Sequence, residues 1–184
     1  MHSGVNAVSE NARYSISGGL YTPEQKKRRD ETVWTLVQGV LAPLQFLVFA
    51  ISTVFVVNFL LNGTGLFAAT ASVILKTFIL YSIMVTGAIW EKVVFGRYLV
   101  APAFFWEDVV SMGVIALHTL SLLMWLTSFG TPQEQMMVAL AAFVTYLVNA
   151  IQFLMKFQQA RSASPDVPSQ PAYAGLELTR GAKS

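Results

Sequence analysis

Three carboxylates flank one short connection between long apolar runs. Glu91 closes the earlier run in the stretch WEKVVFGR, and Glu107 and Asp108 open the later run in the stretch FFWEDVVSM. The end of a helix and apolar neighbours both disfavour an anion, so Glu91 is the better proton donor. The start of a helix favours an anion, so Glu107 and Asp108 are the better bases. Carboxyl groups whose surroundings favour the protonated form in one and the ionised form in the other can act as an acid and a base. We therefore expect these three residues to be catalytic.

Structural roles also explain these acids. Acids in the first turn stabilise a helix through its macrodipole by about 0.3–1 kcal/mol, which accounts for Glu107 and Asp108 without any catalysis. Glu91 is close in sequence to Lys92 and Arg97 and can be their partner at a membrane interface. The sequence leaves both interpretations open.

Polar residues recur at helical spacing inside the apolar runs. Residues three, four or seven apart share one face of a helix. Three such sets occur: Gln38 and Gln45; Glu107, Ser111, His118 and Trp125; and Tyr146, Asn149 and Gln152. Turned inward, these faces would form a polar, aromatic-rich cavity that opens at one membrane surface. Their Gln and Asn side chains can equally serve as hydrogen-bonding contacts between helices.

Two ionisable side chains fall deep within the apolar runs. Lys76 lies in the middle of one run, and His118 lies about 16 Å beyond Glu107 if that run is helical. An ionisable side chain at membrane depth is by default a functional hypothesis. A structural role is the alternative for each.

The composition of the whole chain is that of an integral membrane protein. Of 184 residues, 54% are hydrophobic and 12% are charged. Charge-poor runs at residues 37–61, 67–90, 109–129 and 136–155 can each cross about 30 Å of hydrocarbon. Isolated strands cannot satisfy their backbone in lipid. The sequence therefore predicts an all-α, polytopic membrane protein with four transmembrane helices.

The predicted domain organisation is simple. Residues 1–31 form a polar cytoplasmic segment with a helix start, residues 32–157 form the transmembrane domain, and residues 158–184 form a disordered cytoplasmic tail. Thr22-Pro23-Glu24-Gln25 and Thr131-Pro132-Gln133-Glu134 each have the pattern of a capped helix start. We expect the first transmembrane helix to begin at the earlier motif, before the membrane.

The basic residues indicate the topology. Lys and Arg occur before the first apolar run, between the second and third, and after the fourth, but not in the other two connections. The positive-inside rule places both termini and the connection 91–108 in the cytoplasm. A formal charge of +2 without a basic stripe makes a nucleic-acid partner unexpected. The lack of cysteine excludes thiolate metal sites, and no protein-bound metal is expected.

Two stretches carry a resemblance to a known family. Residues 20–49, LYTPEQKKRRDETVWTLVQGVLAPLQFLVF, and residues 81–112, YSIMVTGAIWEKVVFGRYLVAPAFFWEDVVSM, resemble the 3-vinyl bacteriochlorophyllide hydratase family of bacteriochlorophyll biosynthesis. The resemblance extends over residues 20–157. It implies a membrane hydro-lyase that adds water to the C3-vinyl group of chlorophyllide a or a related bacteriochlorophyllide, giving a 1-hydroxyethyl group. It implies no redox cofactor.

The same resemblance implies the partners of the protein. These are the pigment, water and the lipid bilayer of a bacterial cytoplasmic or intracytoplasmic photosynthetic membrane. A second copy of the chain and other enzymes of pigment biosynthesis are further candidates.

With such a substrate, several residues become candidates for binding it. Lys92, Arg97 or Lys156 would hold the propionate, and Phe104, Phe105 and Trp106 would pack on the ring. Gln38 and Asn149 would contribute polar contacts. His118 would ligate the ring magnesium, hold a water or be structural. Trp90 and Trp106 also suit an interfacial aromatic belt.

Other functions share most of these features. A tetrapyrrole carrier or assembly factor would bind the pigment without changing it. A small transporter would use Lys76 and His118 as ion or substrate contacts. A haem-bearing electron carrier is disfavoured, because only His118 of the two histidines lies in a predicted span.

Overall fold

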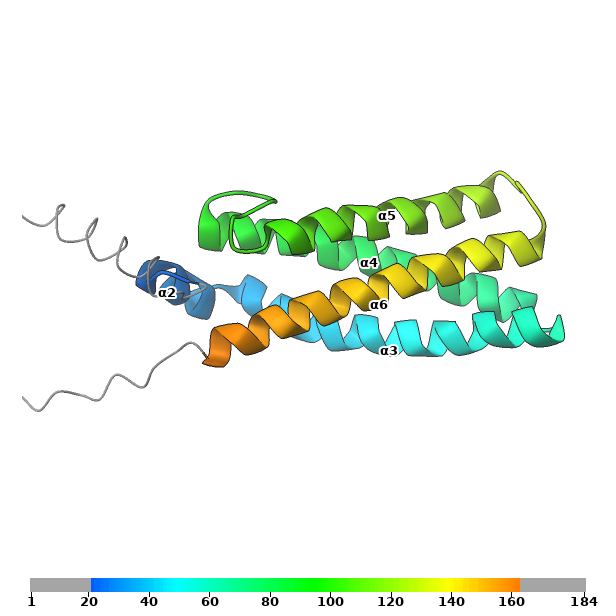
Figure 1. Cartoon of the computed structure of the whole chain (residues 1–184), viewed down its shortest axis with the longest axis horizontal. Helices are drawn as coiled ribbons and strands as arrows, with labels where there is room; N and C mark the ends of the chain where they lie inside the picture. The colour runs from blue at the N-terminus through cyan, green and yellow to red at the C-terminus, as the bar shows by residue number, and fades with distance from the viewer. Residues whose placement is uncertain (1–20, 163–184) are drawn as a thin grey trace, which may run out of the picture.

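The computed structural model describes residues 21–162, with side chains as far as residue 158. These residues form a short helix, α2 (Pro23–Glu31), and four long ones: α3 (Val33–Asn62), α4 (Leu66–Phe95), α5 (Phe105–Leu126) and α6 (Pro132–Ser162) (Figure 1). All four long helices are long and apolar enough to cross a membrane. The predicted all-α class and the four membrane-spanning helices are confirmed.

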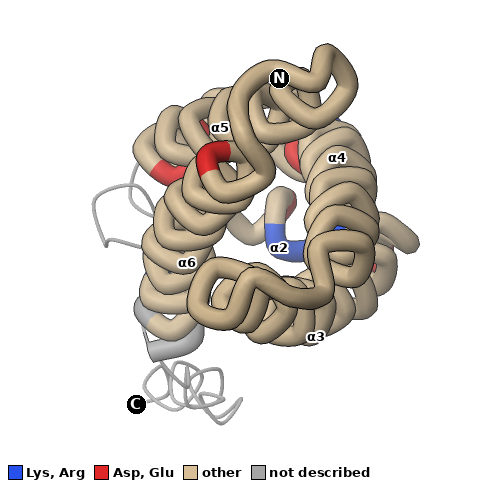
Figure 2. Tube along the Cα trace, turned by 90° about the vertical axis from the view of Figure 1, so that its right-hand side faces the viewer, with Lys and Arg blue, Asp and Glu red and all other residues tan. Residues whose placement is uncertain are grey.

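The long helices form an antiparallel bundle of two hairpins. Packing is closest within the pairs α3 and α4, and α5 and α6. Seen along the bundle, the four helices surround a common centre (Figure 2). The loop 96–104, the start of α5, the end of α6 and helix α2 lie at the same end of the bundle (Figure 1). We call this the carboxylate end, because Glu91, Glu107 and Asp108 lie there.

The first transmembrane helix does not begin at Thr22, which corrects the sequence expectation. Thr22 does form the predicted capping box with Gln25, but the helix it starts ends at Glu31. Thr32 is extended (φ −82°, ψ 137°), and its side chain accepts a hydrogen bond from the Trp34 N–H at the start of α3. One β-branched residue therefore ends α2 and caps α3, separating a polar helix from the apolar one.

The turns at the opposite end set the remaining helix limits. The third apolar run was expected to continue to residue 129, but α5 ends at Leu126. Ser128 and Gly130 take left-handed conformations (φ 52° and 77°), which a helix cannot include. The second predicted cap is confirmed, because Thr131 and Glu134 exchange hydrogen bonds through their side chains and backbone N–H groups.

Two packed clusters hold the bundle together. A central cluster joins all four long helices through residues that include Phe49, Val56, Leu80, Val114 and Phe143. A second, aromatic cluster lies at the carboxylate end and contains Tyr21, Trp90, Val94 and Phe104. Trp90 is buried there, so the expectation that it belongs to an interfacial belt is wrong. The domain boundaries remain predictions, and residues 1–20 and 163–184 lie outside the described part of the chain.

Candidate functional site

The centre of the candidate site is a pair of buried carboxyl groups. Glu91 comes from the last turns of α4 and Asp108 from the first turn of α5, and they are 6% and 4% exposed. Their side chains lie close enough for their charges to interact. Two neighbouring carboxylates in a buried site repel each other, and this repulsion favours a state in which the pair carries one proton. A pair of this kind can hold and release a single proton.

The loop 96–104 covers this pair with its backbone. The Val100 N–H donates to Asp108 Oδ2 at 2.7 Å, and the Ala101 N–H donates to Glu91 Oε2 at 3.4 Å. Val100 has a φ of 58°, which is rare for a β-branched residue. Strain of this kind persists where the surrounding structure enforces it, and here it aims two consecutive N–H groups at the two acids.

We expect Val100→Gly to increase the free energy of unfolding by about 1 kcal/mol. Glycine has no Cβ to clash in the left-handed region, and it keeps the N–H that bonds to Asp108. Thermal unfolding in detergent measures the change. The matched control, Val100→Ala, removes the branched methyl groups but keeps the Cβ, so it should be less stable than the glycine variant. Equal stability of the two variants would show that residue 100 is unstrained.

Glu107 lies apart from the pair, although it neighbours Asp108 in sequence. Its Oε1 is 3.5 Å from Nζ of Lys156, near the end of α6. Its Oε2 is buried without a hydrogen-bond partner among the described residues. Adjacent helical residues project about 100° apart, so only one of the two acids can face Glu91. The structure brings Glu91 together with Asp108, and Glu107 together with Lys156.

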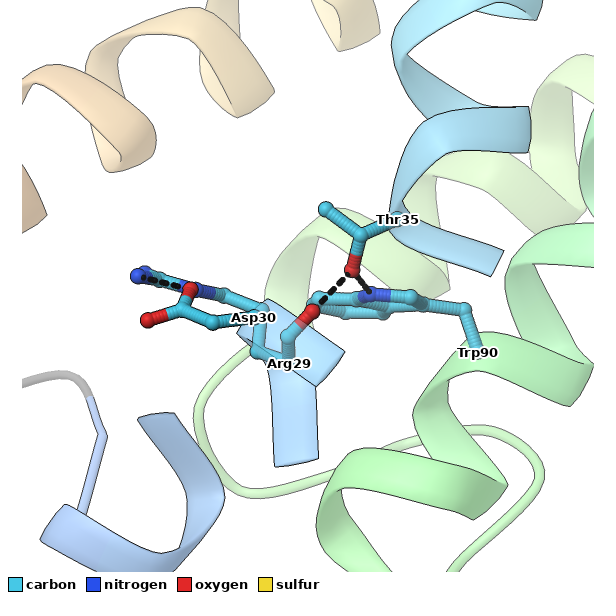
Figure 3. A network of polar contacts seen from close by, with 4 residues as sticks. All are labelled: Arg29, Asp30, Thr35 and Trp90. Carbon is cyan, nitrogen blue, oxygen red and sulfur yellow. Dashed lines mark hydrogen bonds and ion pairs between the residues drawn. The ribbon is translucent and has the colours of Figure 1, made fainter. Parts of the chain in front are cut away.

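Aromatic packing fixes the end of α4 that carries Glu91. The indole N–H of Trp90 donates to Thr35 Oγ1 at 2.9 Å, and Thr35 Oγ1 donates to the Arg29 carbonyl at 2.6 Å (Figure 3). The Phe104 ring lies 5.9 Å from that of Trp90 and 5.9 Å from that of Phe153. Phe104 is thus part of the core and unavailable for packing on a substrate ring, contrary to expectation.

The other residues that were expected to contact the ring and the propionate of the substrate lie on the protein surface. Phe105 is exposed and Trp106 is 71% exposed, and their rings contact each other at 5.3 Å. Lys92 and Arg97 are also exposed. The Lys92 ammonium lies 5.2 Å from the centre of the Tyr98 ring. A flat, apolar ring with an acidic substituent matches the chemistry of this surface.

The expected polar residues of the interior occupy several levels of the bundle. Gln38 donates to Thr86 Oγ1 at 2.7 Å, and Asn149 donates to Ser111 Oγ at 2.8 Å. His118 is buried, and its Nδ1 donates to the Val114 carbonyl at 2.8 Å. Trp125 is exposed, so it does not share the inward face predicted for it.

Sequence reasoning missed two parts of the site. The N–H groups of Val100 and Ala101 carry no sequence signal, because any residue except proline has one. Lys156 was expected to bind the propionate and not to pair with Glu107. A signal for this ion pair existed, because Lys156 continues the stripe of Tyr146, Asn149 and Gln152 along α6.

Comparison with known proteins places this chain in a wider group. A family model described as 2-vinyl bacteriochlorophyllide hydratase (BCHF) matches residues 21–159. A 2-vinyl bacteriochlorophyllide hydratase of Cereibacter sphaeroides is 66% identical over 143 residues, 77% of this chain and 88% of the relative. One from Rhodobacter capsulatus is 63% identical over 150 residues, 80% of this chain and 86% of the relative. No solved structure gives a significant match.

Proposed function

The chain belongs to the 2-vinyl bacteriochlorophyllide hydratase family, and we propose that Glu91 and Asp108 are the acid and base with which it adds water to a vinyl pigment. The protein is a multi-pass membrane hydro-lyase of bacteriochlorophyll synthesis. The observation that carries the proposal is the close approach of these two buried carboxyl groups, each of which accepts a hydrogen bond from the backbone of the loop 96–104. Chlorophyllide a or a related bacteriochlorophyllide is the substrate.

The first step is protonation of the terminal vinyl carbon. This leaves a positive charge on the carbon attached to the ring, where the conjugated macrocycle delocalises it. Glu91 supplies the proton, because Asp108 is the better anion of the pair. Asp108 lies at a helix N-terminus and accepts a short hydrogen bond from the Val100 N–H, and both features favour the carboxylate.

The second step is attack of water on the inner carbon. The water oxygen bonds to that carbon, and a carboxylate takes the proton that the water loses. Asp108 is the base, and the two carboxyl groups again hold one proton between them at the end. The net change is the addition of one water, with no electron transferred and no other reactant consumed.

The substrate binds at the carboxylate end. Trp106 and Phe105 supply an apolar surface for the ring, and Lys92 and Arg97 supply cations for the propionate. The loop 96–104 covers the pair, so it must move aside for the vinyl group to reach Glu91. His118 does not ligate magnesium in this arrangement. It lies about 15 Å along α5 from Asp108, farther than a ring centre lies from its vinyl group.

The carboxylate end faces the cytoplasm of a bacterial inner membrane. The basic residues of α2, of the loop 96–104 and of the end of α6 are on this side, as the positive-inside rule requires. The site is then open to a pigment that carries its propionate at the cytoplasmic surface.

The test is direct conversion. Membranes that contain this protein and no other pigment enzyme are given vinyl chlorophyllide, and mass spectrometry follows the pigment. Conversion adds the mass of one water and produces a hydroxyethyl pigment. Tight binding without any gain in mass would instead identify a pigment carrier.

A further inference from the structure

The bundle interior contains an unusual set of buried polar atoms. Within the part of the chain that the structure describes, these atoms make no hydrogen bond to the protein: Gln45 Oε1, Lys76 Nζ, Glu107 Oε2, His118 Nε2, Asn149 Oδ1 and Gln152 Oε1. Buried polar atoms in folded proteins are almost always hydrogen-bonded, to ordered water where no protein partner is present. The mechanism above uses none of these atoms.

The deepest of them surround the side chain of Tyr146. Lys76 is fully buried, and its Nζ lies 3.5 Å from the centre of the Tyr146 ring. Gln45 is close enough to the Tyr146 hydroxyl to influence it, and its own carbonyl oxygen has no hydrogen-bond partner among the described residues. His118 is close enough to Lys76 for their charges to interact. Four helices thus each contribute one of these side chains to the same region.

The hydrogen-bonding roles of these atoms identify the missing partner. The Nδ1 of His118 must carry a proton because its partner, the Val114 carbonyl, can only accept. The free Nε2 of the neutral ring is then an acceptor, as is the oxygen of Gln45. Lys76 Nζ is a donor. Water has two donors and two acceptors, so it can bind to each of these three atoms. An anion would satisfy only Lys76.

A small cavity also lies near this group, on the side away from the carboxylate end. A cavity of about 10 Å³ lies one helical turn beyond His118, lined by residues that include Val73, Ser121 and Gln135. That volume is about what one water needs, but the lining is mostly apolar and includes none of the atoms named above, so this cavity is not a part of the group.

Three further atoms extend the set toward the carboxylate end. Asn149 and Gln152 follow Tyr146 at intervals of three residues along α6, and Lys156, the partner of Glu107, comes next. The distance from Tyr146 to Lys156 is about 15 Å along the helix. Free acceptor oxygens therefore occur at each turn between the deep group and the surface.

We propose that a column of bound water runs through the bundle from Lys76, His118 and Gln45 to Glu107. The polar atoms named above are its binding groups. One role assigned to the column rests on the proposed function. It holds the co-substrate of a hydration reaction inside the bilayer and supplies it to the catalytic pair near Glu107.

Water-edited solid-state NMR tests the column without any activity assay. The chain has two histidines, so the His2→Asn protein, labelled with ¹⁵N-histidine, reports on His118 alone. Reconstituted in lipid bilayers, it should show transfer of magnetisation from water to the His118 ring. The same measurement on Gln45→Met and Lys76→Met in this background should show loss of that transfer.

A matched control comes from the same turn of α5. Thr119→Val removes a hydroxyl that bonds to Tyr81 at 2.7 Å and that does not belong to the column. It should leave the transfer to His118 intact. Absence of transfer in the His2→Asn protein, or equal loss in Thr119→Val, would overturn the column.

The supply role has a separate readout. Asn149→Leu and Gln152→Met interrupt the column, and both should reduce the rate of hydroxyethyl pigment formation without changing the affinity for the pigment. If the NMR transfer is present but these variants turn over normally, the column does not feed the reaction. If the unmodified protein forms no hydroxyethyl pigment, the proposed function itself fails, and the NMR result still decides the column.

Discussion

Glu91→Gln lowers the rate of vinyl hydration by about 10²–10⁴-fold, the usual contribution of a positioned general acid. The amide has nearly the same shape as the carboxyl group and can still accept the Ala101 N–H, but it cannot protonate carbon. Purified protein in lipid, assayed with vinyl chlorophyllide over a range of concentrations, gives kcat and KM. We expect the loss in kcat, because the substituted group acts in the transition state.

Glu107→Gln is the matched control for that substitution. From the sequence alone, either variant was expected to abolish hydration, because both acids flank the same connection. The structure separates them, since Glu107 contacts Lys156 and not Glu91. Its replacement should therefore cost less activity than that of Glu91. Equal losses would contradict the assignment of Glu91, the neighbour of Asp108, as the acid.

The four long helices could be predicted because the membrane imposes the rule that defines them. Each apolar run must satisfy its own backbone in lipid, so length and composition were enough to identify a helix. The break at Thr32 could not be found in this way. It occurs where the chain is still polar, and it depends on one residue taking an extended conformation. Hydrophobic periodicity identifies a long helix from many residues together, so it cannot locate a break that depends on one extended residue.

The candidate site was only partly predictable, for a different reason. Glu91, Glu107 and Asp108 could be predicted as candidates from their charge and their positions at helix ends. The structure brings Glu91 and Asp108 together. Which acid faces Glu91 depends on the rotation of α5, and this rotation is fixed by packing across the bundle. The burial of Phe104 and the exposure of Trp106 set the same rotation. No local pattern in FFWEDVV distinguishes the three positions.

The interior polar residues show where prediction from periodicity is strongest. The faces of Gln45, His118 and Asn149 were expected to turn inward, and all three side chains are buried. Periodicity could not say which atoms would remain without partners. Whether a buried polar atom finds a partner depends on the distances between helices. Asn149 donates a hydrogen bond to Ser111, whereas His118 Nε2 has no partner among the described residues.

Asp108→Asn lowers the hydration rate about as far as Glu91→Gln, by about 10²–10⁴-fold. The asparagine oxygen keeps the 2.7 Å hydrogen bond from the Val100 N–H, so the loop 96–104 stays in place. The amide cannot take a proton from water. It also cannot favour the protonated Glu91 as a carboxylate does. Both halves of the reaction are therefore impaired by one substitution.

The double variant Glu91→Gln/Asp108→Asn shows whether the two acids act as one unit. Groups that share a proton lose their function together, so the double variant should be no slower than the slower single variant. The measurement is kcat/KM for all four proteins, with thermal unfolding to confirm that each is folded. Losses that multiply would indicate two independent contributions. The shared proton, and with it the acid/base assignment, would then have to be abandoned.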